Sequence, residues 1–285
     1  MTAGGGRGCP TRPPGVSRRT APGFRLGYNL TVLEALLPAV MAVCMVHSPD
    51  LDPEVGRRAL PWLPPDLARQ VVKHKRDFAR GAAAAAAWPQ QFHKPGGPNG
   101  LESIILAQCE RIVQALRSQA PFSEVVAGLG TLAHLTLDLN APFVAHGGDT
   151  YAQAFASYQR SAAPRVPIVF YGQDRIQLGQ AKATIEPYLA TRRRAAASLA
   201  PLVRYDLDRV GGPGRWPALD DRSTSFGAAS LALNHASSVF ANLASWVWRQ
   251  GGGLVPDIPQ GGQRFLVWKG EPRPREAPRV RLRVR

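Results

Sequence analysis

The chain has 285 residues, of which 45% are hydrophobic, so it is long enough to bury a full core, and we expect one domain with tails. Its formal net charge of +15 belongs mainly to the two tails, because residues 1–30 carry five arginines and no acid, and residues 264–285 carry eight basic and two acidic residues. The three cysteines are far apart and odd in number, which excludes a disulfide framework and a cysteine-based zinc site and leaves histidine and carboxylate as ligands for any metal.

The N-terminal part of the chain has two segments of different composition. Residues 1–27 are rich in glycine, proline and arginine without an apolar period, so we expect a disordered basic segment. Residues 28–46 form an apolar run that follows basic residues, an order that resembles an export signal, and a core helix is the alternative. A membrane span is disfavoured because Glu34 and Pro38 interrupt this short run. We therefore expect export to the periplasm or the exterior in preference to a cytoplasmic location.

Helical patterns begin after these two segments. Acids open residues 50–64 and prolines end them, as expected for a helix, and Pro65 restarts a helix that we extend to about Ala86. A loop rich in proline and glycine then presents His93. Residues 101–119 have the apolar period of an amphipathic helix. This part of the chain therefore reads as helices joined by loops.

The next predicted helix, over residues 121–140, carries an ionisable pair in an apolar setting, and Ser123 is available to cap its start. His134 and Asp138 are four residues apart and therefore share one helix face, while Gly130, one turn earlier, leaves room for a partner to approach. Leucines surround the pair, and a carboxylate among them is costly to desolvate unless a cation or several donors compensate it. A metal ion is the simplest compensator, whereas a hydrogen bond within the pair is the commoner explanation for such spacing.

Two helices and one extended run are expected after this segment. An aromatic-rich helix covers residues 149–160. The run PRVPIVFYG, residues 164–172, has strand-like composition, but no second strand-like run lies nearby, so we expect it to lie extended across helices. Residues 178–209 read as one long helix, with the three arginines 192–194 on a solvated face.

The most apolar predicted helix is the last one. Residues 224–249 are apolar on nearly every side and are followed by three glycines, so we expect a central, buried helix. His235 lies within it, and we interpret it as a core histidine in preference to a ligand. Residues 251–285 contain proline-rich and glycine-rich runs and read as a linker and a basic tail.

The segment His134-Leu-Thr-Leu-Asp138-Leu-Asn-Ala-Pro142-Phe143 resembles the signature of bacterial zinc-dependent phospholipase C and of the related zinc-dependent single-strand nucleases. In that signature a histidine, an aspartate four residues later and a proline four after that lie on and after one helix. A looser likeness covers about residues 57–250. The resemblance implies an all-α fold, with a single helical domain of the phospholipase C type at 47–250 and disordered basic tails.

The sequence departs from the family pattern at three places. Where the family has a second histidine two residues after the proline, this chain has Val144, and its next histidine is His146. The family's later helix carries a histidine and an acid four residues apart, whereas Val239 follows His235 at that spacing. Only His47 is available to match the N-terminal ligands of the family, and its neighbours do not align. We therefore expect one zinc ion, if any, with two or three as the alternative.

The resemblance implies a metal site of His93, His134, Asp138 and His146, in which Asp138 is the catalytic residue that bridges metals and orients a bound water. The implied reaction is hydrolysis of a phosphodiester, in a small molecule or a phospholipid head group, by that water. The alternative is a catalytically degenerate relative that acts as a binding or envelope scaffold. The basic tails are expected to make at most weak contact with polyanions, and no motif of sequence-specific nucleic-acid recognition occurs. The oligomeric state stays open.

Overall fold

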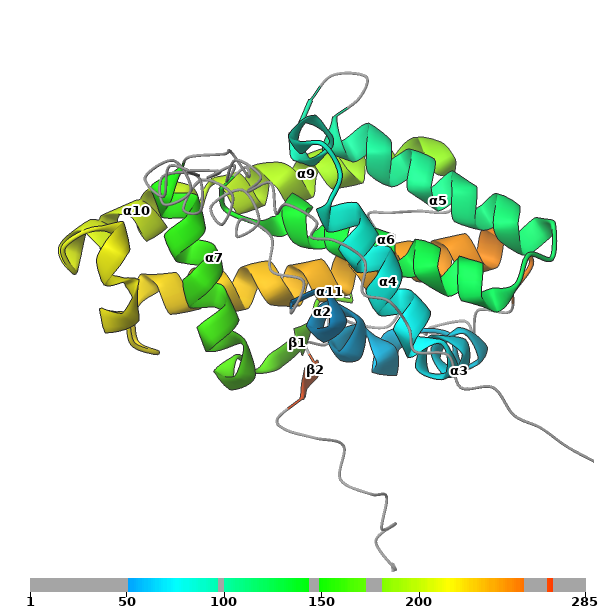
Figure 1. Ribbon diagram of the computed structural model, residues 1–285, viewed down its shortest axis with the longest axis horizontal. Coiled ribbons are helices and arrows are strands. Elements are labelled where there is room, and N and C mark those ends of the chain that lie inside the picture. Colours follow the sequence, from blue (N-terminus) through cyan, green and yellow to red (C-terminus); the bar gives the residue numbers. More distant parts are fainter. Residues whose placement is uncertain (1–50, 97–99, 144–148, 173–180, 254–265, 269–285) are drawn as a thin grey trace, which may run out of the picture. The chain divides into compact units, whose positions relative to one another are not determined.

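The computed structural model describes residues 51–96, 100–143, 149–172, 181–253 and 266–268 (Figure 1). The expected segments 1–27 and 28–46 and most of the tail after residue 253 lie outside these ranges, as do His47, Val144 and His146. Over the described ranges, none of the helices combines the length and the hydropathy that a membrane span needs.

Helices make up most of the described chain, so the expected all-α class is confirmed. In chain order the elements are α2 (Leu51–Ala59), the 3-10 turn η1 (Leu60–Trp62), α3 (Pro65–Lys73), α4 (Lys75–Ala86), η2 (Gln90–His93), α5 (Leu101–Arg117), α6 (Phe122–Asn140), α7 (Thr150–Ala162), η3 (Ala163–Arg165), β1 (Ile168–Phe170), η4 (Lys182–Thr184), α9 (Ile185–Ala197), α10 (Ala200–Arg209), η5 (Pro213–Ala218), α11 (Thr224–Gln250) and β2 (Leu266–Trp268).

Helices α6 and α11 form the centre of the core. Every residue of α6 from Leu129 to Asn140 is buried, and so is every residue of α11 from Ala236 to Trp248. The expected central helix at 224–249 is therefore confirmed. Helices α4, α5 and α11 all pack against α6, so the helix that carries His134 and Asp138 is enclosed by packed helices (Figure 1).

Helices α4 and α6 approach so closely that only glycine fits at two contact points. A Cβ placed on Gly130 would lie 1.9 Å from the carbonyl oxygen of Phe78, and one placed on Gly81 would lie 1.8 Å from the carbonyl oxygen of Ala127. The Thr131 hydroxyl donates to the Gly81 carbonyl at 3.0 Å across the same contact. The room for a partner that the sequence indicated at Gly130 is therefore occupied by the backbone of α4.

Two helices that the sequence presents as continuous are each broken in two. The helix expected from Pro65 to Ala86 is interrupted at His74, whose φ and ψ of −106° and 32° are not helical. The helix expected over 178–209 ends at Ala197, and α10 begins at Ala200 with Pro201 in its first turn. Proline lacks the N–H that a continuous helix needs and disfavours helical backbone in the residue before it, so it starts a new helix. Ser123 also does not cap α6, since the cap position is Pro121 and no side chain there accepts a hydrogen bond.

The expectation that residues 164–172 lie extended without a strand partner is wrong. Ile168–Phe170 forms β1, which pairs antiparallel with β2, so that Ile168 lies opposite Trp268. Its other edge faces α11, where Asn234 Oδ1 accepts from the Val169 N–H at 3.1 Å and Ser238 Oγ accepts from the Tyr171 N–H at 3.0 Å. The strand is therefore tied on both edges, to α11 and to a partner about 100 residues later.

Arg58, only 1% exposed, links α2 to the chain before β1 and to α11. Its guanidinium donates to the carbonyl oxygens of Ala163 at 2.8 Å and Val166 at 3.1 Å and to Asn234 Oδ1 at 3.2 Å. Glu54 accepts from the same group at 2.7 Å and balances its charge. A buried guanidinium is tolerated when its donors are satisfied in this way, so α2 is fixed in position by directional bonds as well as by apolar packing.

Candidate metal centre

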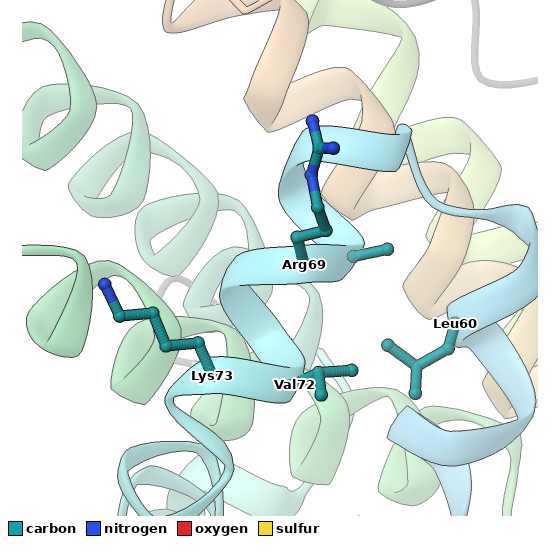
Figure 2. Close-up of a pocket in the computed structure, with 5 residues that line it drawn as sticks. Leu60, Arg69, Val72 and Lys73 are labelled. Atoms are coloured by element: carbon teal, nitrogen blue, oxygen red, sulfur yellow. The ribbon is translucent and has the colours of Figure 1, made fainter.

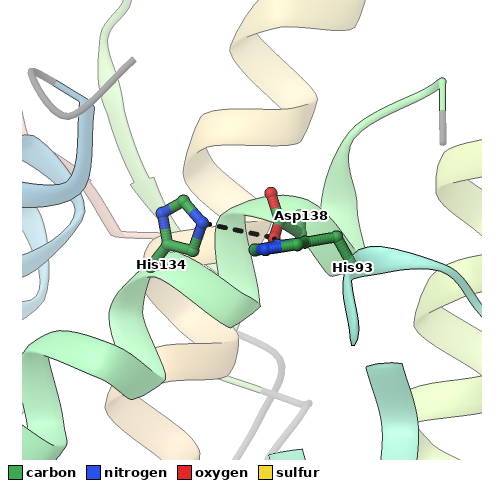
Figure 3. A group of neighbouring side chains, drawn as sticks. All are labelled: His93, His134 and Asp138. Atoms are coloured by element: carbon green, nitrogen blue, oxygen red, sulfur yellow. Dashed lines mark hydrogen bonds and ion pairs between the residues drawn. The ribbon is translucent and has the colours of Figure 1, made fainter. Parts of the chain in front are cut away.

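Three side chains that could hold a metal ion meet in the core. His134 and Asp138 come from α6, and His93 is the last residue of η2. One donor atom from each lies within 4.8 Å of the other two, and the three side chains are buried. Figure 3 shows both imidazole rings directed toward the Asp138 carboxylate. Three of the four ligands expected from the sequence are thus neighbours in space, and the fourth, His146, lies outside the described residues.

The local sequence explains how each of these residues reaches the cluster. The spacing of four places His134 and Asp138 one above the other on α6, and the helix ends two residues after Asp138. His93 lies in the loop between α4 and α5, where the Trp88 and Phe92 rings pack edge to face at 6.3 Å. The Leu101 N–H donates to the Lys94 carbonyl at 2.7 Å and closes this loop onto α5.

The distances within the cluster show direct hydrogen bonding at one pair and a wider approach at the other. His93 Nδ1 lies 2.6 Å from Asp138 Oδ2, and His134 Nε2 lies 3.4 Å from the same oxygen. The two imidazole rings are perpendicular, with centroids 5.4 Å apart. Asp138 Oδ2 therefore lies between two histidines that come from different elements, and it is hydrogen-bonded to His93.

The sequence interpretation missed a fourth buried group, Asp52. Its carboxylate has no exposed surface, and both of its oxygens face His134 Nδ1, at 3.0 and 3.2 Å. From sequence alone, the acids of this segment indicate only favourable charges at a helix start. A stronger signal was available, because Asp52 shares a face with Val55 and Ala59, which are apolar at offsets of three and seven. An acid on the core face of an amphipathic helix indicates a buried partner.

The two carboxylates change the acidity of His134. Burial of the ring lowers its pKa, but attraction from Asp138 and the hydrogen bond and charge of Asp52 outweigh burial and raise the pKa of His134 to about 9. Without a metal ion, the histidine therefore serves as the cation between two buried acids at neutral pH. A metal ion that binds Nε2 must displace this proton.

Arg193 supplies a positive charge at the end of α6, and it corrects the expectation of a solvated arginine face at 192–194. The side chain is buried, and its guanidinium donates to the Ala141 carbonyl at 2.5 Å and more weakly to the Leu139 carbonyl at 3.4 Å. Burial lowers the pKa of Arg193, whereas attraction to Glu102 and Asp138 opposes this. Arg193 therefore satisfies terminal carbonyls of α6 directly beyond Asp138.

The donor set fits zinc in chemistry and nearly in spacing. Two imidazoles and one carboxylate are the protein ligands of one common kind of catalytic zinc site, which keeps a fourth position for water. Ligands about 2.0–2.1 Å from a tetrahedral ion lie about 3.3 Å from one another, close to the 3.4 Å between His134 and Asp138. The 2.6 Å between His93 and Asp138 is shorter, so binding through those two atoms requires the shared proton to leave and the side chains to separate slightly.

Two other features lie apart from this cluster. An open pocket of about 370 Å³ between η1 and α3 is lined by Leu60, Ala68, Arg69, Val72 and Lys73, and none of the cluster residues lines it (Figure 2). His235 is half-buried and stacks on Tyr171 with ring centroids 4.0 Å apart. Burial, together with repulsion from Arg192, lowers the pKa of His235 to about 3. A neutral, stacked imidazole agrees with the core role expected for it.

Arg204 contacts the residues on both sides of positions 144–148. Its guanidinium carbon lies 5.3 Å from the centroid of the Phe143 ring and 4.7 Å from that of Tyr151. The same side chain donates to Asp149 Oδ2 at 3.0 Å. Asp149 also caps α7 by accepting from the Tyr151 and Ala152 N–H groups. Phe143 and Asp149 are therefore held by one side chain of α10.

Comparison with known proteins identifies the fold. No family profile and no curated protein match the sequence. Among solved structures, the alpha-toxin of Clostridium perfringens avian strain SWCP matches with a TM-score of 0.52 and 10% identity, over 72% of this chain and 64% of the toxin chain. The alpha toxin of Clostridium absonum matches with a TM-score of 0.49 and 15% identity, over 73% and 61%. This chain thus spans less than two thirds of the length of either toxin. The first match shows that the matched part of this chain shares the fold of the corresponding part of that alpha-toxin.

Proposed function

We propose that the chain is a zinc-dependent hydrolase of phosphodiester bonds, similar to phospholipase C, whose metal ligands include His93, His134 and Asp138. The observation that carries this proposal is that three buried donors, separated by up to 45 residues, converge at the segment that resembles the family signature. The all-α fold, which was expected from the same resemblance, also supports it. His146 is proposed as a further ligand from the sequence alone.

The three side chains have distinct roles in this proposal. When bound, zinc would supply a water of lowered pKa, near 7, and charge stabilisation at the phosphoryl oxygens. Asp138 would balance the positive charge and accept a hydrogen bond from the attacking water through its carboxylate. His93 and His134 would hold the ion from two elements, and Arg193 fixes the helix end that bears Asp138. The substrate is proposed to be a small phosphodiester or a phospholipid head group, and the chain to be exported.

The test compares metal content and hydrolysis in matched variants. We expect wild-type protein, stripped with a chelator and reloaded, to bind at least one zinc per chain by plasma mass spectrometry and to hydrolyse bis(p-nitrophenyl) phosphate. Asp138→Asn should lose both, because the amide removes the negative charge at the centre of the cluster. Asp66→Asn is the control, because Asp66 is exposed on α3 and outside the cluster. Wild-type zinc content and affinity in Asp138→Asn would exclude Asp138 as a ligand.

A scaffold without catalytic activity is the second candidate, and one observation favours it. His93 and Asp138 are bonded at 2.6 Å, and His134 is bonded to Asp52 at 3.0 Å, so the buried charges compensate one another without an ion. In that case the wild-type protein binds no zinc at micromolar concentration and hydrolyses no phosphodiester. Zinc bound without hydrolysis would indicate a relative that keeps a structural metal.

A further inference from the structure

We infer that Asp52 is a positioning residue, which holds His134 in the tautomer and orientation that direct Nε2 toward Asp138. This inference rests on the proposed metal site. It concerns a residue of α2, outside the segment that resembles the family signature. Asp52 and His134 are both without exposed surface and are 82 residues apart in sequence, so their contact is made only by the packing of α2 on α6.

The contact geometry places the two carboxylates at opposite nitrogens of one ring. Asp52 bonds Nδ1 at 3.0 and 3.2 Å, whereas Asp138 Oδ2 lies 3.4 Å from Nε2. The imidazole ring therefore separates Asp52 from the proposed ion. Asp52 therefore contacts His134 on the side of the ring that faces away from the proposed ion. The Asp52 oxygens that bond Nδ1 are not placed to bind that ion.

The chemistry of imidazole gives this arrangement a consequence. A neutral imidazole carries one N–H, and either carboxylate could accept it. Asp52 lies 3.0 Å from Nδ1, whereas Asp138 lies 3.4 Å from Nε2, so the proton is held on Nδ1 and the lone pair is left on Nε2. The partner of the second nitrogen fixes the ring orientation of a metal-bound histidine and raises its basicity. Asp52 is thus suited to both tasks.

The contacts of α2 hold Asp52 in position beside His134. Leu51 and Val55 bury the start of α2, and Arg58 anchors the end of the same helix through three carbonyl oxygens and Asn234. The backbone that bears Asp52 is therefore held by packing at one end of α2 and by hydrogen bonds at the other, and the carboxylate itself has no exposed surface. His134 in turn lies on α6, which is packed on several sides.

The first test measures zinc affinity by competition with a chromophoric chelator. Asp52→Asn keeps the shape and one acceptor oxygen but loses the charge, and we expect it to weaken zinc binding by about 10- to 100-fold. Asp52→Leu should weaken it further. Asp206→Asn is the matched control, because Asp206 is also buried and hydrogen-bonded but contacts Arg209 and Ser225. It should keep wild-type affinity.

The second test reads the tautomer directly and does not depend on zinc or on hydrolysis. Long-range ¹H–¹⁵N correlation spectra of the full-length, metal-free protein at about pH 10 should show His134 protonated on Nδ1 in the wild type and in Asp52→Asn. Asp52→Leu should shift the proton toward Nε2. If Asp52→Leu does not fold, Asp52→Asn still tests the role through its affinity.

The outcomes separate this inference from the proposed function. Zinc binding without hydrolysis would contradict the enzyme but leave the affinity test of Asp52 intact. A wild-type protein that binds no zinc would overturn the proposed metal role, and the inference would fail with it even if the Nδ1–H tautomer were found. Wild-type zinc affinity in both Asp52 variants, or an Nε2–H tautomer in the wild type, would overturn the role of Asp52 alone.

Discussion

At the level of single residues, the cluster of His93, His134 and Asp138 shows why the sequence was sufficient to find three candidate ligands and insufficient to find Asp52, the partner of His134. His134 and Asp138 follow from a spacing of four, and His93 follows from a resemblance, so all three are visible in a linear sequence. Asp52 contributes through a contact 82 residues away. No local sequence pattern predicts a contact over that separation. The only sequence signal for Asp52 is its position on the apolar face of α2, which indicates a buried side chain.

The acidity of His134 gives a prediction about stability without metal. Its pKa is raised from 6.5 to about 9, so the folded state binds the proton more tightly than the unfolded state. Protonated His134 therefore contributes its full stabilisation of the folded state below about pH 6.5, and this contribution is lost as pH rises through about 9. In urea titrations with a chelator present, we expect the free energy of unfolding to fall by up to about 3 kcal/mol between pH 6 and pH 10.

The control for this prediction is His134→Gln, which cannot titrate. Its free energy of unfolding should depend less on pH over the same range, although the variant is less stable throughout. Equal pH slopes in the two proteins would mean that the ring is not held as a cation between Asp52 and Asp138.

At the level of elements, the contact between α4 and α6 sets the position of the cluster. Gly130→Ala places a methyl group against the Phe78 carbonyl, a backbone atom that cannot rotate away. We expect a loss of about 3 kcal/mol or more in the free energy of unfolding, together with weaker zinc binding, because α6 must move. Denaturant unfolding and chelator competition measure the two effects.

The matched control for Gly130 is Gly227→Ala in the first turns of α11. No atom lies within 4 Å of a Cβ built at Gly227, so the same change there should be neutral or stabilising by up to about 1 kcal/mol. If both variants were equally stable, the close approach of α4 and α6 would have relaxed around the methyl group.

The elements also show which parts of the fold the sequence predicts. Amphipathic period and apolar content predicted α5, α6 and α11 closely, because burial of a continuous face is a local property. The two helix breaks were missed for different reasons. Pro201 is a visible stop signal, but the residues on both sides of it have high helix propensity, so the segment resembles one helix. The break at His74 has no proline or glycine to mark it. The β1 strand was missed because its partner lies about 100 residues away.

At the level of the whole chain, the pairing of β1 with β2 tests how much of the C-terminal tail the fold needs. A chain that ends at residue 262 lacks β2, but β1 keeps its bonds to Asn234 and Ser238. We expect it to fold, with a melting temperature a few degrees below that of the full chain by circular dichroism. A chain that ends at residue 270 keeps β2 and should match the full chain. A loss of helical signal in the shorter chain would show that the tail is part of the core.

The bond from Arg58 to Asn234 has a consequence for the order in which the chain is made. Its two partners are 176 residues apart, so at 5–20 residues per second the ribosome produces them roughly 10–35 seconds apart. Until Asn234 emerges, α2 lacks one of its fixed anchors, and Asp52, on the same helix, has no settled place behind His134. The contact between Asp52 and His134 is therefore fixed fully only after residue 234 has been made, well after α6 itself.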